Sequence, residues 1–117
     1  MKMNNTRSDI ISSTPSPPYY AVIFTSLRTP GENGYKEMAR KMDELVATMP
    51  GFLGQETVRE DLGVSVSYWR TLEDVRNWKK NSEHLFAQEK GRSTWYTAYK
   101  VRVCLVERDY GWEKEKV

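Results

Sequence analysis

The sequence predicts a single α+β domain in which four strands and two helices alternate. The chain has 117 residues, which is enough for one hydrophobic core but not for two. Its apolar residues recur at helical spacing in two regions, and four other regions are rich in β-branched and aromatic residues bounded by turn signals. The helical regions lie between the strand regions, so the expected order of elements is βαββαβ.

The first half is expected to be a strand, a helix and a return to the sheet. Residues 19–28 are rich in aromatic and β-branched side chains and end at the turn signal of residues 29–31. Apolar side chains then recur at helical spacing over residues 35–49, with charged side chains opposite them, which predicts a helix of about four turns. Asn33 is the predicted N-cap, and Pro50 ends the helix because proline disfavours the helical conformation of the residue before it.

A hairpin is expected next. Residues 52–60 and 64–70 both have the composition of strands, and the Asp-Leu-Gly sequence of residues 61–63 fits a tight turn between them. The second of these strands alternates apolar and polar side chains, which is the pattern of a sheet with two distinct faces.

The second helix is expected to begin at residues 71–74, which have the form of a capping box, and to run through Trp78. The Asn-Ser pair of residues 81–82 can break and recap it. A further helical piece over residues 83–96 then leads into a final strand over residues 98–108.

Right-handed crossovers place both helices on one face of a four-stranded antiparallel sheet, which is the ferredoxin-like arrangement. Both faces of this sheet carry apolar side chains, since Val22 and Phe24 alternate with Ala21, Ile23 and Leu27. A sheet that is apolar on both faces must be covered on both. The chain has no residues left for a second layer, so a second copy is the expected cover and the protein is expected to be a homodimer.

Composition excludes several classes of function. The net charge of +2, with 29% charged residues and no basic block, does not indicate a nucleic-acid partner. No apolar stretch approaches the roughly 20 residues of a membrane span, and a cytoplasmic protein is expected. One cysteine, Cys104, and one histidine, His84, exclude an internal disulfide and any multi-thiolate or multi-histidine metal site. Residues 1–18 are expected to form a flexible arm, residues 19–110 the domain and residues 111–117 a tail.

Candidate site residues gather on one side of the segment 83–99 when it is projected at helical period. This stripe consists of His84, Gln88, Gly91, Arg92, Trp95 and Tyr99. Burying unpaired polar groups costs about 1–3 kcal/mol each. The polar members therefore either bond to one another and to the backbone, or line a cavity.

Each candidate has a structural reading and a functional one. A histidine at position 84 could take a proton from a phenolic substrate or serve as a hydrogen-bonded packing residue. Trp78 and Trp95 are core aromatics that can also wall a ligand pocket. Tyr68 can point toward the helices or into a dimer. Gln88 and Arg92 can both hold an anionic ligand. The alternative for Arg92 is an ion pair with a glutamate.

Two sequence features resemble the antibiotic biosynthesis monooxygenase (ABM) superfamily, a group of dimeric α+β barrel proteins. They are the Met-Pro-Gly-Phe-Leu-Gly sequence of residues 49–54 and the Val-Ser-Tyr-Trp-Arg strand of residues 66–70, which leads into a helix carrying Trp78. The resemblance covers about residues 19–110. Residues from Trp78 to Tyr110 are similar to a subgroup of bacterial monooxygenases without an assigned substrate.

The resemblance implies a cofactor-independent monooxygenase that oxidises an aromatic, phenol-like small molecule, with His84 as catalytic base and the other candidates around the substrate. The alternative is a non-catalytic protein that binds a small molecule or haem. Haem-degrading members pair a tryptophan, matched by Trp78, with an asparagine and a histidine. Thr25 and Gln88 stand at those two positions here, with His84 one turn before the second. No cofactor is therefore expected, and haem is the alternative.

Overall fold

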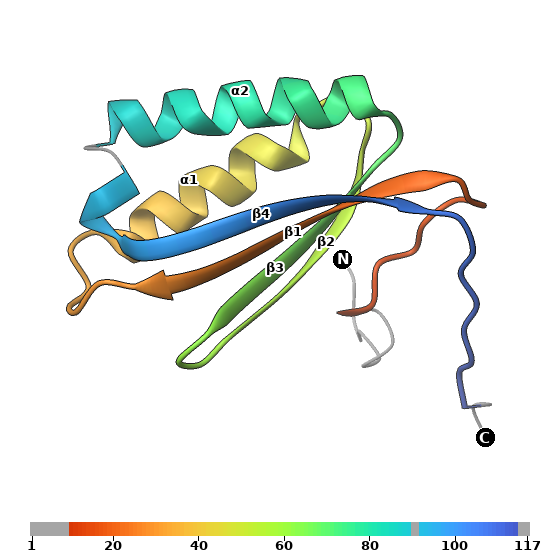
Figure 1. The fold of residues 1–117 in the computed structure, drawn as a ribbon, viewed down its shortest axis with the longest axis horizontal. Coiled ribbons are helices and arrows are strands. Elements are labelled where there is room, and N and C mark those ends of the chain that lie inside the picture. Colours follow the sequence, from red (N-terminus) through yellow and green to blue (C-terminus); the bar gives the residue numbers. More distant parts are fainter. Residues whose placement is uncertain (1–9, 90–91, 115–117) are drawn as a thin grey trace, which may run out of the picture.

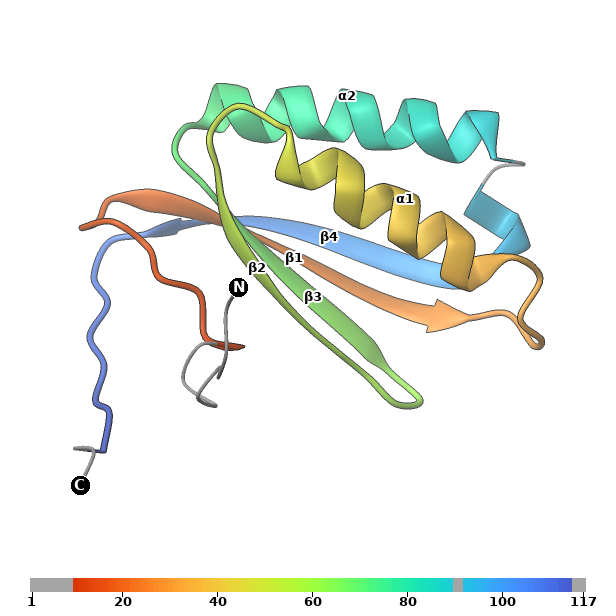
Figure 2. The same cartoon turned by 180° about the vertical axis from the view of Figure 1, so that it is seen from behind.

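The computed structural model describes residues 10–89 and 92–114 and confirms the predicted βαββαβ order (Figure 1). The strands form one antiparallel sheet in the order β2-β3-β1-β4. Both helices lie on one face of this sheet, as the view from behind also shows (Figure 2), so the fold is ferredoxin-like as expected. The elements are β1 (Tyr19–Arg28), α1 (Tyr35–Ala47), β2 (Phe52–Arg59), β3 (Gly63–Trp69), α2 (Leu72–Gln88), the 3-10 turn η2 (Arg92–Thr94) and β4 (Tyr96–Val106).

Helix α1 is capped by a glutamate rather than by the predicted Asn33. Asn33 adopts a left-handed conformation with φ of 51° and donates its side-chain amide to the carbonyl of Pro30, so Gly34 takes the N-cap position. The carboxylate of Glu32 accepts hydrogen bonds from the backbone N–H groups of Gly34 (2.9 Å) and Lys36 (2.6 Å). These bonds, that of Lys36 first, lower the pKa of Glu32.

The predicted start of α2 is confirmed, with Thr71 as its N-cap. Thr71 accepts a hydrogen bond from the backbone N–H of Asp74 (3.1 Å) and donates its hydroxyl hydrogen to the Asp74 carboxylate (2.8 Å). Gly51 packs beneath that carboxylate, and a Cβ atom at this position would overlap it. Its φ of 79° also favours glycine, which explains the glycine after the helix-ending Pro50.

Helix α2 is continuous to Gln88, so the predicted break at residues 81–82 is wrong. The amide of Asn81 donates to the carbonyl of Asn77 one turn earlier (2.8 Å), and the hydroxyl of Ser82 donates to the carbonyl of Lys79 (3.1 Å). These side chains find their hydrogen-bond partners within the helix, so the helix continues past them. The predicted helical piece over residues 83–96 is therefore the end of α2 followed by η2, and β4 begins earlier than predicted, at Tyr96.

Two buried clusters fill the space between the sheet and the helices. The first surrounds Trp69, which is fully buried and stacks on Trp78 with ring centroids 5.9 Å apart. Its other buried members are Val22, Val46 and Val75. The second consists of Met38, Phe86 and Trp95, with Tyr35, Met42 and Tyr96 packed against it.

The opposite face of the sheet is covered by no helix of the described chain (Figures 1 and 2). At one end of this face the backbone N–H of Ser12 donates to Glu56 (2.8 Å), which also accepts the hydroxyl of Tyr68 (2.7 Å). The N-terminal arm is thereby held against β2, and its first nine residues lie outside the described range. Within residues 10–89 and 92–114, no helix is long and apolar enough to cross a membrane.

Candidate functional site

One row of paired residues crosses the sheet on the face that carries the helices. The strand register pairs Arg59 with Gly63, Gly63 with Ser26, and Ser26 with Tyr99. Residues paired directly across neighbouring strands point to the same side of a sheet. Ser26 shares its side of β1 with Val22, a member of the first buried cluster. The row therefore lies beneath the helices.

A cavity of about 350 Å³ lies between this face and both helices. Its size falls within the range of about 300–1,000 Å³ that is common for ligand pockets. Members of both buried clusters line it, so the cavity separates the two: Val22, Val46, Val75 and Trp78 from the first, and Met38, Met42, Phe86, Tyr35 and Tyr96 from the second. Val101 and Val103 of β4 also line it and are 47% and 50% exposed, which places an opening beside this edge strand. Val58 of the other edge strand, β2, lines it as well and is 65% exposed.

The charged end of the cavity is formed by Arg59. One guanidinium nitrogen, Nη2, donates to the hydroxyl of Ser26, whose side chain is buried. The other, Nη1, is also buried and has no hydrogen-bond partner within the described chain. The guanidinium carbon lies 5.9 Å from the ring centroid of Tyr35. A cation with a free donor thus faces a space lined mainly by apolar and aromatic side chains. Its other charged lining residues, Asp43, Lys79 and Glu83, belong to the two helices.

Gly63 makes room for this guanidinium. A Cβ atom at Gly63 would overlap both Cζ and Nη2 of Arg59, because the arginine side chain lies directly across the glycine. The φ of Gly63 is outside the left-handed region, unlike those of Gly31, Gly34 and Gly51. Glycine here gives the guanidinium its space and is not demanded by the backbone conformation.

Aromatic rings surround the neighbouring part of the cavity. Phe24 lies 5.5 Å from Tyr96 and 5.1 Å from Tyr99 between ring centroids, and Tyr35 lies 6.0 Å from Tyr96. Burial, followed by the neighbouring Tyr35, raises the pKa of Tyr96 well above its ordinary value, so this phenol stays neutral. At neutral pH the Tyr96 hydroxyl is therefore a hydrogen-bonding group of the cavity wall and not a base.

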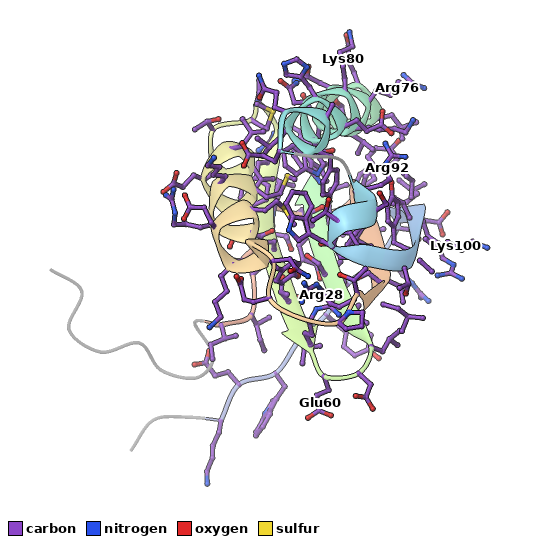
Figure 3. The ribbon with its side chains drawn as sticks, turned by 90° about the vertical axis from the view of Figure 1, so that its left-hand side faces the viewer. Arg28, Glu60, Arg76, Lys80, Arg92 and Lys100 are labelled. Carbon is purple, nitrogen blue, oxygen red and sulfur yellow. The ribbon has the colours of Figure 1, made fainter. Side chains whose placement is uncertain are left out.

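Arg28 fixes the position of Tyr35. Its guanidinium carbon stands 3.7 Å from the Tyr35 ring centroid, and its Nε donates to the carbonyl of Trp95 (3.0 Å). Figure 3 shows Lys80 and Lys100 projecting outward from the fold, whereas Arg28 is half-buried. Arg28 is thus a structural cation with its partners already in place, in contrast to Arg59.

Of the three predicted aromatic site residues, the structure brings Trp78 to the cavity and leaves the other two elsewhere. Trp95 is buried in the second cluster, and its indole N–H donates to the carbonyl of Asn33 (2.9 Å). Tyr68 points to the opposite face of the sheet, where it bonds to Glu56. Burial, with this hydrogen bond second, raises the pKa of Tyr68 to about 12.

The three predicted polar site residues are exposed and do not line the cavity. His84 and Gln88 lie two positions before and after the buried Phe86, which is about 200° around a helix and so on its outer side. Arg92 belongs to η2, beyond the end of α2, where helical spacing no longer applies. Its guanidinium carbon is 5.9 Å from the ring centroid of Tyr99, a cavity residue.

The sequence reasoning missed Arg59, Gly63 and Ser26. Gly63 was expected in the turn, whereas it is the first residue of β3 and pairs with the last residue of β2. An arginine opposite a glycine at the closed end of a hairpin was the available signal, because the missing side chain leaves space for the long one. Among the described residues, no group of three or more His, Cys, Asp or Glu side chains could hold a metal ion.

These features define a small α+β protein with a ligand-sized cavity between its sheet and its helices. The family model described as antibiotic biosynthesis monooxygenase matches residues 18–90, and the chain belongs to this family, as its sequence resemblance suggested.

The chain is also similar to a protein of known sequence and to solved structures. The uncharacterized protein YqjZ of Bacillus subtilis (strain 168) is 50% identical over 102 residues, which cover 86% of this chain and 90% of the relative. Two solved structures share the fold at a TM-score of 0.65. SnoaB, a cofactor-independent oxygenase from Streptomyces nogalater, is 10% identical over 80% of this chain and 97% of its own. Rv0793 from Mycobacterium tuberculosis is 13% identical over 80% of this chain and 99% of its own.

Proposed function

We propose that this protein is a monooxygenase that oxidises an aromatic, phenol-like small molecule in the cavity between its sheet and its helices, without a cofactor. The observation that carries the proposal is the cavity itself, which is ligand-sized, lined mainly by apolar and aromatic side chains, and open beside β4. Membership of the ABM family and the description of SnoaB as a cofactor-independent oxygenase support the reaction type.

The chemistry needs no external reductant, because the substrate supplies the electrons. An ionised phenol is electron-rich and reacts with molecular oxygen at an activated ring or benzylic carbon. Where that carbon carries two hydrogens, one oxygen atom becomes a carbonyl group on it and the other leaves with both hydrogens as water. The protein's part is to hold the ring, exclude bulk water and favour the ionised phenol.

The cavity residues suit these tasks. Trp78 lies on the wall formed by α2, and Phe24 and Tyr99 lie on the sheet, so a flat ring can be held between opposing surfaces. The catalytic role predicted for His84 and the binding roles predicted for Gln88 and Arg92 stay predictions, and the exposed positions of all three give them no support.

Oxygen uptake tests the proposal. Purified protein is mixed with a panel of phenols and hydroquinones in an oxygen-electrode cell, and the product is analysed by mass spectrometry under isotopically labelled oxygen. We expect one labelled oxygen atom in the product and a lower rate in Trp78→Ala. His84→Ala tests the predicted catalytic base. If its rate of oxygen uptake equals that of wild type, His84 is not the base.

The outcome also separates the alternative function. A panel member that raises the melting temperature without consuming oxygen would identify a non-catalytic ligand-binding protein and would contradict the monooxygenase. Haemin belongs in the same panel, because haem binding is the other form of that alternative.

The proposed active form is a homodimer that buries the helix-free face of the sheet. Val64 and Val66 lie on this face and remain partly exposed, as does Ile23 on the neighbouring strand. In the C-terminal tail, Tyr110 and Trp112 are 99% and 86% exposed. Exposed apolar side chains that gather on one face usually mark an interface. The cytoplasmic location of the protein also stays a prediction.

A further inference from the structure

The free donor of Arg59 is the least satisfied group in the cavity. Nη1 is buried without a hydrogen-bond partner in the described chain, and none of the ion pairs formed by the described residues includes Arg59. Leaving a buried donor unpaired costs about 1–3 kcal/mol, and more when the group is charged. A guanidinium cannot remove this cost by losing its proton, because arginine stays charged in proteins. A ligand that accepts from Nη1 would remove it.

We infer that the cavity takes an aromatic ligand carrying an anionic oxygen group, and that Arg59 and Ser26 hold this group at the hairpin end of the sheet. The inference deepens the proposed function by defining its substrate class, and it rests on the cavity being the ligand site. The inference does not depend on a reaction with oxygen, because a binding measurement alone can test whether the cavity prefers an anionic ligand.

The chemistry of the two residues favours an anion over a neutral polar group. Nη1 of Arg59 can donate to the anionic oxygen, and the bond would be charge-assisted. The Ser26 hydroxyl accepts from Nη2, so its own hydrogen is free to point at the same ligand group. An adjacent cation also favours the ionised form of a phenol or a carboxylic acid.

The aromatic part follows from what lies next to this charged end. Tyr99 is paired with Ser26 across the sheet, and its ring packs 5.1 Å from Phe24 between centroids. A ligand whose anionic group meets Ser26 therefore has its ring system beside these two rings. Beyond them the cavity is lined by Val101 and Val103 toward the opening beside β4, which leaves the far end of the ligand in apolar surroundings.

Gly63 is a positioning residue for the same group. A side chain at Gly63 would displace the guanidinium while leaving its charge in the protein, because the overlap is with the flexible end of Arg59. Gly63→Ala therefore moves the cation without removing it, whereas Arg59→Met removes it. The backbone conformation of Gly63 is open to alanine, so this variant is expected to fold.

A matched pair of fluorescent probes tests the inference on the full chain. Anilinonaphthalenesulfonate is anionic, and phenylnaphthylamine has the same ring skeleton without the charge. Both are titrated into wild type, Arg59→Met, Gly63→Ala and the control Arg76→Met. Arg76 is an exposed arginine of α2 outside the cavity lining (Figure 3). Circular dichroism and denaturation midpoints verify that each variant is folded.

In Arg59→Met we expect the dissociation constant of the anionic probe to rise by roughly 10- to 100-fold, which is the size of a hydrogen bond to a charged group. The neutral probe should change by less than about threefold on the same scale. Gly63→Ala should weaken only the anionic probe, and Arg76→Met should change neither.

Other results overturn the inference in distinguishable ways. If the anionic probe binds Arg59→Met as tightly as wild type, or if both probes lose affinity equally, the anion site is wrong while the cavity remains a ligand site. If neither probe binds wild type, the cavity is not a ligand site, and the proposed function fails together with this inference.

Discussion

Replacing Met38 by alanine should cost about 4 kcal/mol of unfolding free energy. Met38 is 2% exposed, packs with Phe86 and Trp95, and forms part of the cavity wall. Losing about three buried methylene-sized groups costs roughly 2.4 kcal/mol at about 0.8 kcal/mol each. The space left behind, roughly 70 Å³, adds about 1.7 kcal/mol at about 24 cal/mol per Å³. This loss is a large fraction of the stability of an ordinary domain, about 5–15 kcal/mol.

Urea denaturation at fixed protein concentration measures this cost. Met42→Ala is the matched control, because Met42 lines the same cavity from the same helix but is only partly buried, and its cost should be about half as large. Phenylnaphthylamine should restore part of the stability of Met38→Ala, since a ligand that fills the enlarged cavity stabilises only the folded state. A cost below about 1 kcal/mol with an unchanged denaturant slope would refute the enclosed position of Met38.

Two further predictions concern the helix-free face of the sheet. Tyr68 has a pKa raised from 10.0 to about 12, so its contribution to stability is complete below pH 10 and is lost as the pH rises through 12. Denaturation midpoints should fall less steeply over this range in Tyr68→Phe than in wild type, and coincident pH profiles would contradict the raised pKa of this phenol. Val66→Lys should convert the proposed dimer to monomers in sedimentation equilibrium, whereas Leu62→Lys at the exposed hairpin tip should not. If the wild-type protein sediments as a monomer, the proposed homodimer is wrong.

The order of elements could be predicted because its signals are local. Periodicity identified α1, the capping residues 71–74 identified the start of α2, and turn residues identified the hairpin. The errors came where a side chain had a choice of partners. Asn33 bonds to Pro30 instead of capping α1, and Asn81 bonds within α2 instead of ending it. Propensity alone does not decide such choices, because the competing bonds differ by little free energy.

The cavity was harder to predict for a different reason. Projecting residues 83–99 at one helical period assumed a helix throughout, and the helix ends at Gln88. Arg59 became a candidate only once the register of the hairpin and the position of its guanidinium over Gly63 were known. Both depend on tertiary structure. The strand pattern correctly located β2, but it carried no information about the unpaired Nη1 of Arg59.

The claim that the ligand site is the cavity between the helices and the sheet can be tested without any substitution. Methionine methyl groups are labelled with carbon-13, and their NMR signals are followed as anilinonaphthalenesulfonate is added. Met38 and Met42 line the cavity, whereas Met49 packs against the first cluster outside the lining. We expect the Met38 and Met42 methyl signals to shift in a saturable manner while that of Met49 stays in place. Saturable binding of the probe with no shift at Met38 or Met42 would contradict the account.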